Sequence, residues 1–160
     1  PGGVAERVGN RARSGHVEAP PRSAGGGGSG HGGADAVGVA HVGPINWIST
    51  LEIAADRIGP AIAWQHAEIG HPVDDADYLR RVSPYFHSDL IQRPLLLAYG
   101  ANDRRYAQDE IDEFAAAIRA NGVPLEHLKL AGEGHYIAGK QNLIELQRAT
   151  LRFLDRWLSE

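Results

Sequence analysis

Two apolar runs of strand length, joined by one helical stretch, constrain the fold of this chain more than any other part of its sequence. The first run, RPLLLAYG at residues 93–100, is continuous after its proline, which indicates a strand buried on both faces. The second run, PLEHLKL at residues 124–130, alternates imperfectly and fits a short strand. Residues 108–121 carry one apolar stripe of helical spacing between them. Strand, helix and strand in this order predict parallel strands joined by a right-handed crossover, and therefore an α/β fold.

An acid and a histidine follow these two expected strands. Asp103 comes just after the first run ends at Gly100, and His135 comes just after the second run, in the segment GEGH. Ligands of open α/β sheets bind at the carboxyl ends of the strands, so both side chains are expected at one edge of the sheet. A carboxylate there fixes the tautomer of an imidazole, whose other nitrogen can then act as general base to a serine. Each residue alone has an ordinary interpretation, Asp103 as a helix cap and His135 as a loop histidine. Together, in this order, they favour the catalytic one.

The rest of the globular part is predicted to be one more strand and several helices. VGVAHVG at residues 37–43 is short, β-branched and closed by Gly-Pro, which suits a buried strand. Residues 45–72 have apolar positions at three- and four-residue spacing between Gly and Pro breaks, and residues 74–90 are amphipathic and break near Ser83-Pro84. Residues 141–158 are expected to form a packed amphipathic helix whose apolar positions are Leu143, Leu146, Leu151, Phe153, Leu154, Trp157 and Leu158.

The first 36 residues differ in composition from everything that follows. They hold 11 of the 20 glycines and have neither a helical nor an alternating apolar period. Such a stretch buries too little apolar surface to offset its chain entropy, so we expect it to be disordered. The sequence therefore predicts a Gly/Arg-rich leader at residues 1–36 and a globular domain at residues 37–160.

Charge and composition exclude several classes of protein. The formal net charge of −4 gives no electrostatic case for a nucleic-acid partner. No apolar stretch approaches the roughly 18 residues that a membrane span requires. The absence of cysteine excludes a disulfide scaffold, a thiol nucleophile and a thiolate zinc site. These observations predict a cytoplasmic protein with no nucleic-acid or membrane partner.

The globular part resembles the prolyl oligopeptidase family of serine peptidases, nearest its acylaminoacyl-peptidase and dipeptidyl-peptidase branches. The similar segments are VGPINW, the Ser83-Pro84 pair, RPLLLAYGANDRRY, GVPLEHLKL and EGH followed by a long terminal helix, together spanning roughly residues 37–158. The resemblance implies the C-terminal portion of an α/β-hydrolase fold, a parallel sheet with flanking helices. It also implies a serine-type peptidase or acyl hydrolase that acts on a peptide substrate without a cofactor, with Asp103 and His135 as the acid and base of the triad.

The nucleophile is harder to place. The family has an elbow of the form G-x-S-x-G-G about two dozen residues before the position of Val42, and no such motif stands there. Ser29, in GGGGSGHGG, is the tentative nucleophile: Gly27 fits the position two before it, but His31 occupies the position two after it. Ser23 lacks the preceding glycine. We therefore expect a truncated or frame-disturbed chain that is weakly active or inactive, with a possible missing N-terminal domain or oligomer partner.

Two alternatives remain open at this stage. The chain could be a non-catalytic α/β-hydrolase remnant that acts only by packing against another chain. A metal site could also be drawn from His31, Asp35, His41, His66 and His71, but the five-residue spacing of His66 and His71 does not put them on one helical face. We therefore predict no metal. Substrate preference is not predicted, because in the family it depends largely on an N-terminal propeller and on pocket loops.

Overall fold

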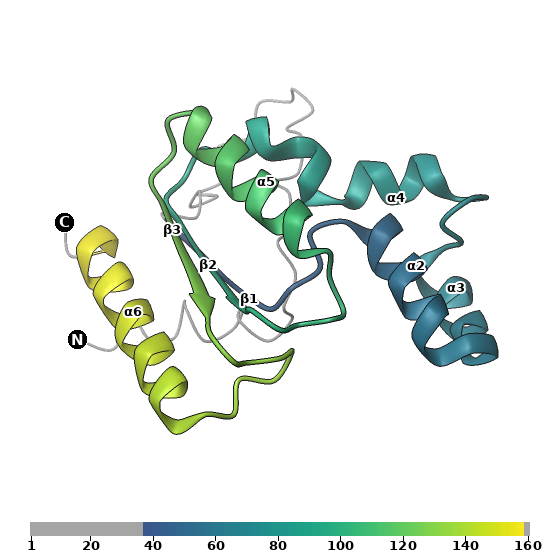
Figure 1. Ribbon diagram of the computed structural model, residues 1–160. Coiled ribbons are helices and arrows are strands. Elements are labelled where there is room, and N and C mark those ends of the chain that lie inside the picture. The colour runs from purple at the N-terminus through teal and green to yellow at the C-terminus, as the bar shows by residue number, and fades with distance from the viewer. Residues whose placement is uncertain (1–36, 159–160) are drawn as a thin grey trace, which may run out of the picture.

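The computed structural model describes residues 37–158, which form a three-stranded parallel sheet with helices on both faces (Figure 1). The strands are β1 (Gly38–His41), β2 (Leu95–Gly100) and β3 (Leu125–Leu130), in the order β1-β2-β3. In register, Ala40 lies opposite Leu97, and Leu97 lies opposite His127. The expected parallel pairing of the last two strands is confirmed, and the predicted ends of all three strands agree with the structure to within about two residues.

The central strand is buried along its whole length, as its continuous apolar run predicts. Helix α5 (Gln108–Ala120) covers one face of the sheet and helix α6 (Lys140–Leu158) covers the other, and Figure 1 shows the two helices on opposite sides. We call these the α5 face and the α6 face. Side chains of β2 alternate between them, because successive residues of a strand point to opposite sides.

The α5 face holds the main core of the protein. The predicted stripe of α5 is buried in full and packs on the odd-numbered side chains of β2. The members of this core come from four segments: the loop after β1, strand β2, helix α5 and the turn before β3. The buried members are Ile45, Leu95, Leu97, Tyr99, Ile111, Phe114, Ala115, Ile118 and Val123.

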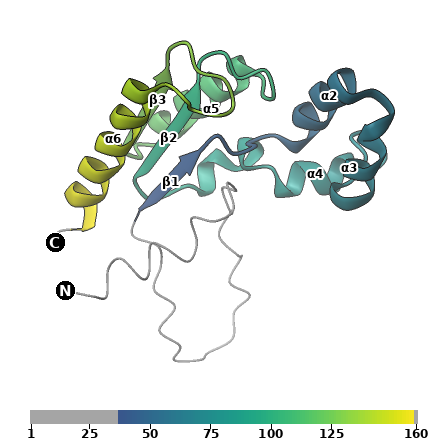
Figure 2. The same cartoon turned by 90° about the horizontal axis from the view of Figure 1, so that it is seen from below.

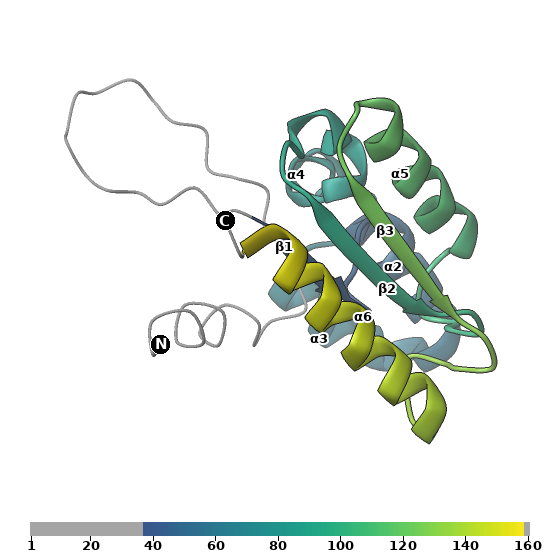
Figure 3. The same cartoon turned by 90° about the vertical axis from the view of Figure 1, so that its left-hand side faces the viewer.

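The α6 face is covered less completely, and part of the predicted stripe on α6 is wrong. Helix α6 lies along this face (Figure 3) and buries Leu146, Ala149 and Phe153, which follow one another at spacings of three and four. Leu151 lies two residues from both Ala149 and Phe153, on the opposite side of the helix, and is 67% exposed. Leu143, in the first turn of α6, is exposed as well.

Helices α2 (Trp47–Ile58), α3 (Ile62–Ile69) and α4 (Ala76–Val82) form an arm that extends to the side of the sheet (Figure 2). A short 3-10 turn, η1 (Gly59–Ala61), separates α2 from α3, and a second, η2 (Pro84–Leu90), leads from α4 towards β2. The expected helical turns and the break at Ser83-Pro84 are thus confirmed. Within residues 37–158, no helix is long and apolar enough to cross a membrane.

Buried polar side chains join this arm to the main core. Asn46 caps α2 by accepting a hydrogen bond from the Ile48 amide, and its Nδ2 donates to Glu110 at the start of α5 over 2.9 Å. The Ser49 hydroxyl donates to the same carboxylate at 2.6 Å. Ser83 is fully buried; its Oγ accepts from the Trp47 amide and donates to a carbonyl oxygen of α4. The arm is therefore tied to α5 by hydrogen bonds to a charged group.

Candidate active site

The loops that follow β2 and β3 meet at the carboxyl edge of the sheet. The Ala101 amide donates to the Leu130 carbonyl at 2.9 Å, and the Asn102 amide donates to the Glu133 carbonyl at 2.8 Å. Parallel neighbouring strands that end in register bring the loops after them together, as the sequence predicted. The backbone of the Asp103 loop is thereby fixed directly to the backbone of the loop that carries His135.

Gly100, the last residue of β2, allows this close approach. A Cβ atom placed on it would lie 2.1 Å from the Gly134 carbonyl oxygen and 2.6 Å from that of Glu133. Any side chain there would have to push the His135 loop away from the sheet. The glycine at this position is therefore a requirement of the site, and not only a mark of the strand end.

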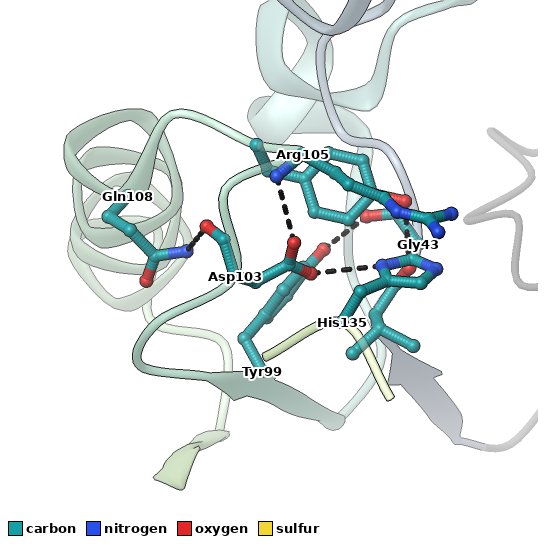
Figure 4. A network of polar contacts seen from close by, with 8 residues as sticks. Gly43, Tyr99, Asp103, Arg105, Gln108 and His135 are labelled. Carbon is teal, nitrogen blue, oxygen red and sulfur yellow. Dashed lines mark hydrogen bonds and ion pairs between the residues drawn. The ribbon is translucent and has the colours of Figure 1, made fainter. Parts of the chain in front are cut away.

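Asp103 and His135 form a hydrogen-bonded pair (Figure 4). The His135 Nδ1 lies 3.0 Å from Asp103 Oδ2, which is hydrogen-bond distance, at the edge of the sheet where the sequence predicts both side chains. The carboxylate side chain is fully buried, and the imidazole is 18% exposed. The other carboxylate oxygen accepts from the Arg105 amide at 2.9 Å, and Gln108 at the start of α5 donates to the Asp103 carbonyl. The carboxylate is therefore held from two sides.

This arrangement determines which ring nitrogen can act as a base. A carboxylate only accepts hydrogen bonds, so the 3.0 Å contact places the ring proton on Nδ1 and leaves a lone pair on Nε2 of His135. The buried Asp103 also stabilises the imidazolium that forms if Nε2 takes up a proton. The pair can thus accept a proton from a hydroxyl and return it to a leaving group.

Two tyrosines connect the end of β1 to this pair. The Tyr106 hydroxyl donates to the Val42 carbonyl at 2.9 Å, and the Tyr99 hydroxyl donates to the Gly43 carbonyl. Burial, followed by the negative charge of Asp103, raises the pKa of Tyr106 to about 12, and burial raises that of Tyr99 as well. Both phenols therefore stay neutral donors near neutral pH. They fix the turn at Val42, whose positive φ of 46° is unusual for a β-branched residue.

The exposed rim of the site carries an arginine and a further tyrosine. The Arg105 guanidinium lies over the Tyr136 ring at 5.3 Å from its centroid, and Tyr136 is 74% exposed. The Tyr136 ring also meets the His135 ring edge-on at 5.1 Å. A cation and an aromatic face thus border the base on its solvent side, and sequence reasoning did not single out either residue.

His41 is a second histidine near the pair. It ends β1, and burial, together with the positive charge that His135 can carry, lowers its pKa. The sequence suggests no role for His41 except that of a possible metal ligand. Among the residues that the structure describes, no group of three or more His, Cys, Asp or Glu side chains could hold a metal ion. The rings of His66 and His71 meet edge-on, and the His71 Nδ1 accepts from backbone amides of the next turn.

The tentative nucleophile Ser29 lies outside the described residues, as do His31 and Asp35 and the whole predicted leader. Within residues 37–158, no hydrogen bond joins a serine hydroxyl to the His135 ring. The buried Ser83 is occupied by its bonds to α2 and α4. The catalytic roles of Asp103, His135 and Ser29 stay predictions.

Comparisons with known proteins agree with the resemblance seen in the sequence. The sequence profile of the prolyl oligopeptidase family matches residues 33–160. Dipeptidyl aminopeptidase BIII of Pseudoxanthomonas mexicana is 32% identical over 125 residues, which are 77% of this chain and 18% of that protein. Dipeptidyl peptidase family member 6 of Caenorhabditis elegans is 32% identical over 130 residues, 77% of this chain and 17% of that protein. The chain therefore spans less than a fifth of the length of these curated relatives.

Solved structures show the same fold at lower identity. A puromycin-hydrolysing peptidase of Mycobacterium tuberculosis superposes with a TM-score of 0.66 at 22% identity, over 76% of this chain and 18% of that one. The acylaminoacyl peptidase of Pyrococcus horikoshii gives a TM-score of 0.64 at 18% identity, over 79% of this chain and 21% of that one. The sheet and its flanking helices thus match part of an α/β-hydrolase fold, which confirms the predicted fold class.

Proposed function

This chain belongs to the prolyl oligopeptidase family, and we propose that it carries the acid and the base of a serine peptidase that cleaves peptides by Ser-Asp-His acyl transfer. The observation that supports this most directly is the 3.0 Å contact between His135 Nδ1 and the fully buried Asp103 carboxylate. A carboxylate that only capped a helix would not need to orient an imidazole. In the proposal, Asp103 orients and His135 transfers the proton.

The proposed reaction proceeds in two acyl-transfer steps. His135 Nε2 takes the proton of a serine hydroxyl while the serine oxygen bonds to the peptide carbonyl carbon, and the imidazolium then protonates the leaving amine as the peptide bond breaks. Water, deprotonated by the same nitrogen, then hydrolyses the acyl-enzyme and regenerates the serine. In this chain the candidate nucleophile is Ser29, which lies outside the described residues.

The substrate class in this proposal is peptides and related aminoacyl amides. Its support is the names of the relatives, which are dipeptidyl peptidases and a puromycin-hydrolysing peptidase. We propose weak activity for this chain because no elbow motif of the family precedes β1 in its sequence. A cytoplasmic location stays a prediction from the sequence.

One observation favours the alternative of a non-catalytic module. No serine hydroxyl of the described region is hydrogen-bonded to His135, so the base has no nucleophile among residues 37–158. In that alternative the pair persists as part of the fold and the chain acts only by packing. The two hypotheses differ in one property, the presence of a serine that His135 activates.

Labelling by a fluorophosphonate probe distinguishes the two hypotheses, since the probe reports a serine that a base has activated. We expect slow labelling of the 160-residue chain that falls about 10³-fold or more in His135→Gln, because the base is then lost. The control is His71→Gln, which removes an imidazole from the helical arm and should leave labelling unchanged. Loss of labelling in Ser29→Ala would identify the nucleophile. A labelling rate that is the same with and without His135 would instead favour the non-catalytic module.

A further inference from the structure

Glu133 is a buried carboxylate, only 7% exposed, two residues before His135. Its side chain accepts three hydrogen bonds from the segment beyond the histidine. Oε2 accepts from the Ala138 amide at 2.9 Å, and Oε1 accepts from the Gly139 amide at 2.9 Å and from Asn142 Nδ2 at 2.7 Å. The side chain therefore bridges the two ends of the loop on which His135 stands.

The same residue also joins this loop to the loop of the acid. Its carbonyl oxygen accepts from the Asn102 amide at 2.8 Å, one residue before Asp103. Asn142, in the first turn of α6, donates a second hydrogen bond to the Ala131 carbonyl at 3.1 Å. The backbone of Glu133 is thus bound to the loop after β2, and its side chain to the start of α6.

Packing around the carboxylate leaves little freedom. A Cβ atom on Gly139 would lie 2.3 Å from Glu133 Oε1, so the glycine is needed for the carboxylate to reach the two amides. The hydrogen bond from Asn142, followed by that from the Ala138 amide, lowers the pKa of Glu133. The group is therefore charged at neutral pH, and hydrogen bonds to a charged acceptor are stronger than those to a neutral one.

We infer that Glu133 is a positioning residue for His135: its carboxylate closes the loop 133–139 and so holds the imidazole against Asp103. The inference rests on the proposed function, because only there does the orientation of His135 have a consequence. Glu133 does not touch the reacting atoms, and its effect passes through the loop. Asp103 fixes the ring from one side, and Glu133 fixes the backbone from which the ring projects.

Both side-chain oxygens of Glu133 face hydrogen-bond donors, so the position requires a carboxylate. In Glu133→Gln an NH₂ group replaces one oxygen, so it would face either the Ala138 amide or the donors on Oε1, and two donors cannot bond to each other. The surface variant Glu145→Gln makes the same chemical change in an exposed residue of α6 and serves as the matched control.

The experiment uses the full chain labelled with ¹⁵N and follows two signals by NMR. The first is the spectrum that correlates the ring protons of His135 with its two ring nitrogens through two-bond ¹H–¹⁵N couplings, which reports the tautomer. Its signals are assigned by comparison with His135→Gln. The second is hydrogen exchange at the Ala138 and Gly139 amides. In Glu133→Gln we expect exchange at both amides to accelerate about tenfold or more, and the single Nδ1-protonated tautomer to give way to a mixture. In Glu145→Gln both signals should match the unmodified chain.

A folded Glu133→Gln chain with an unchanged His135 tautomer would overturn the inference. If that variant fails to fold, Asn142→Ala takes its place, since it removes only the side-chain donor to Oε1 and to the Ala131 carbonyl. We then expect a smaller change of the same two signals. Loss of the fold in both variants would assign Glu133 to general stability and would also overturn the inference.

The outcome is independent of the test of the proposed function. An unmodified chain that is not labelled by the fluorophosphonate probe, but whose His135 tautomer depends on Glu133, would refute the function and retain the positioning role. A chain whose labelling depends on His135, but whose His135 tautomer is unchanged in Glu133→Gln, would support the proposed function and overturn the positioning role.

Discussion

The two faces of the sheet are built differently, and the loops of the candidate pair lead into helices on opposite faces, that of Asp103 into α5 and that of His135 into α6. On the α5 face, nine buried residues form one core, and Gln108 at the start of α5 donates to the Asp103 carbonyl. On the α6 face, helix α6 buries Leu146, Ala149 and Phe153, but Val39 and His41 of β1 are exposed. The loop of His135 leads into α6 and is closed by the carboxylate of Glu133.

This contrast shows that the acid and the base are fixed by different forces. Asp103 follows a strand that is buried on both faces and precedes a helix whose apolar stripe is buried in full. Apolar burial therefore supports the acid. His135 precedes a helix with a partly exposed stripe, and its loop relies on hydrogen bonds to one charged group. We expect the base to be the member of the pair that is displaced more easily.

The largest expected effect concerns one phenylalanine on each face. Phe114 on α5 is 1% exposed and Phe153 on α6 is fully buried. Phe114→Ala should lower the free energy of unfolding by about 3–5 kcal/mol, because it leaves a cavity inside the nine-residue core. Phe153→Ala should cost less, since Val39 and His41 of β1 leave part of the α6 face uncovered, so that neighbouring side chains can relax into the space. Urea unfolding of both variants measures the difference, and equal costs would remove the contrast between the faces.

A smaller effect is expected where the two faces meet, at the end of β2. Gly100→Ala places a methyl group 2.1 Å from the Gly134 carbonyl oxygen, so the His135 loop has to move away from the sheet. We expect a loss of about 1–3 kcal/mol in the free energy of unfolding. The NMR signals of His135 should change more than those of Asp103, because the base is less firmly held.

Gly134→Ala is the matched control for this substitution. A Cβ atom there meets no heavy atom within 4 Å, and the residue is not among those with positive φ. Its stability should therefore stay close to that of the unmodified chain. If Gly134→Ala proved as costly as Gly100→Ala, the effect would come from the loss of glycine in general and not from the contact between the loops.

A still smaller difference between the two faces is expected in how the free energy of unfolding depends on pH. His127 of β3 faces α5, where its Nε2 is buried without a hydrogen-bond partner, and burial lowers its pKa despite the nearby Asp112. Below pH 6.5 the unfolded chain therefore binds a proton at His127 that the folded chain does not yet bind. The stability that neutral His127 contributes is present above this pH, and it is lost as the pH falls towards the lowered pKa of the folded state.

The variant His127→Gln should therefore lose less stability than the unmodified chain between about pH 7 and pH 5. Urea unfolding at both pH values measures this. His41→Gln on the α6 face should change the dependence in the same direction but by less, because His41 is more exposed. If the pH dependence of stability changed more in His41→Gln than in His127→Gln, the conclusion that the α5 face is covered more completely than the α6 face would be contradicted.

Sequence reasoning predicted one face of the molecule better than the other for a physical reason. The stripe of α5 has a single register, and the sheet covers all of it, so periodicity was enough. Helix α6 has apolar side chains on more than one side, and periodicity does not tell which of them meets the sheet. The meeting of Asp103 and His135 followed from chain order and strand ends. The contacts of Glu133 did not, because they depend on how the loop closes on itself.

The smallest expected effect concerns Leu151, which the sequence analysis placed in the packed stripe of α6. It is 67% exposed and lies on the side of the helix opposite Ala149 and Phe153, so Leu151→Gln should change the free energy of unfolding by no more than about 0.5 kcal/mol. Leu146→Gln, five residues earlier and only 8% exposed, should cost several times more, since it buries an unpaired amide against the sheet. A loss of more than about 1 kcal/mol for Leu151→Gln would mean that something covers this side of α6 in solution. Repeating the unfolding over a range of protein concentrations would then show whether a second copy of the chain is responsible, because a loss caused by self-association grows with concentration, whereas a loss within one chain does not.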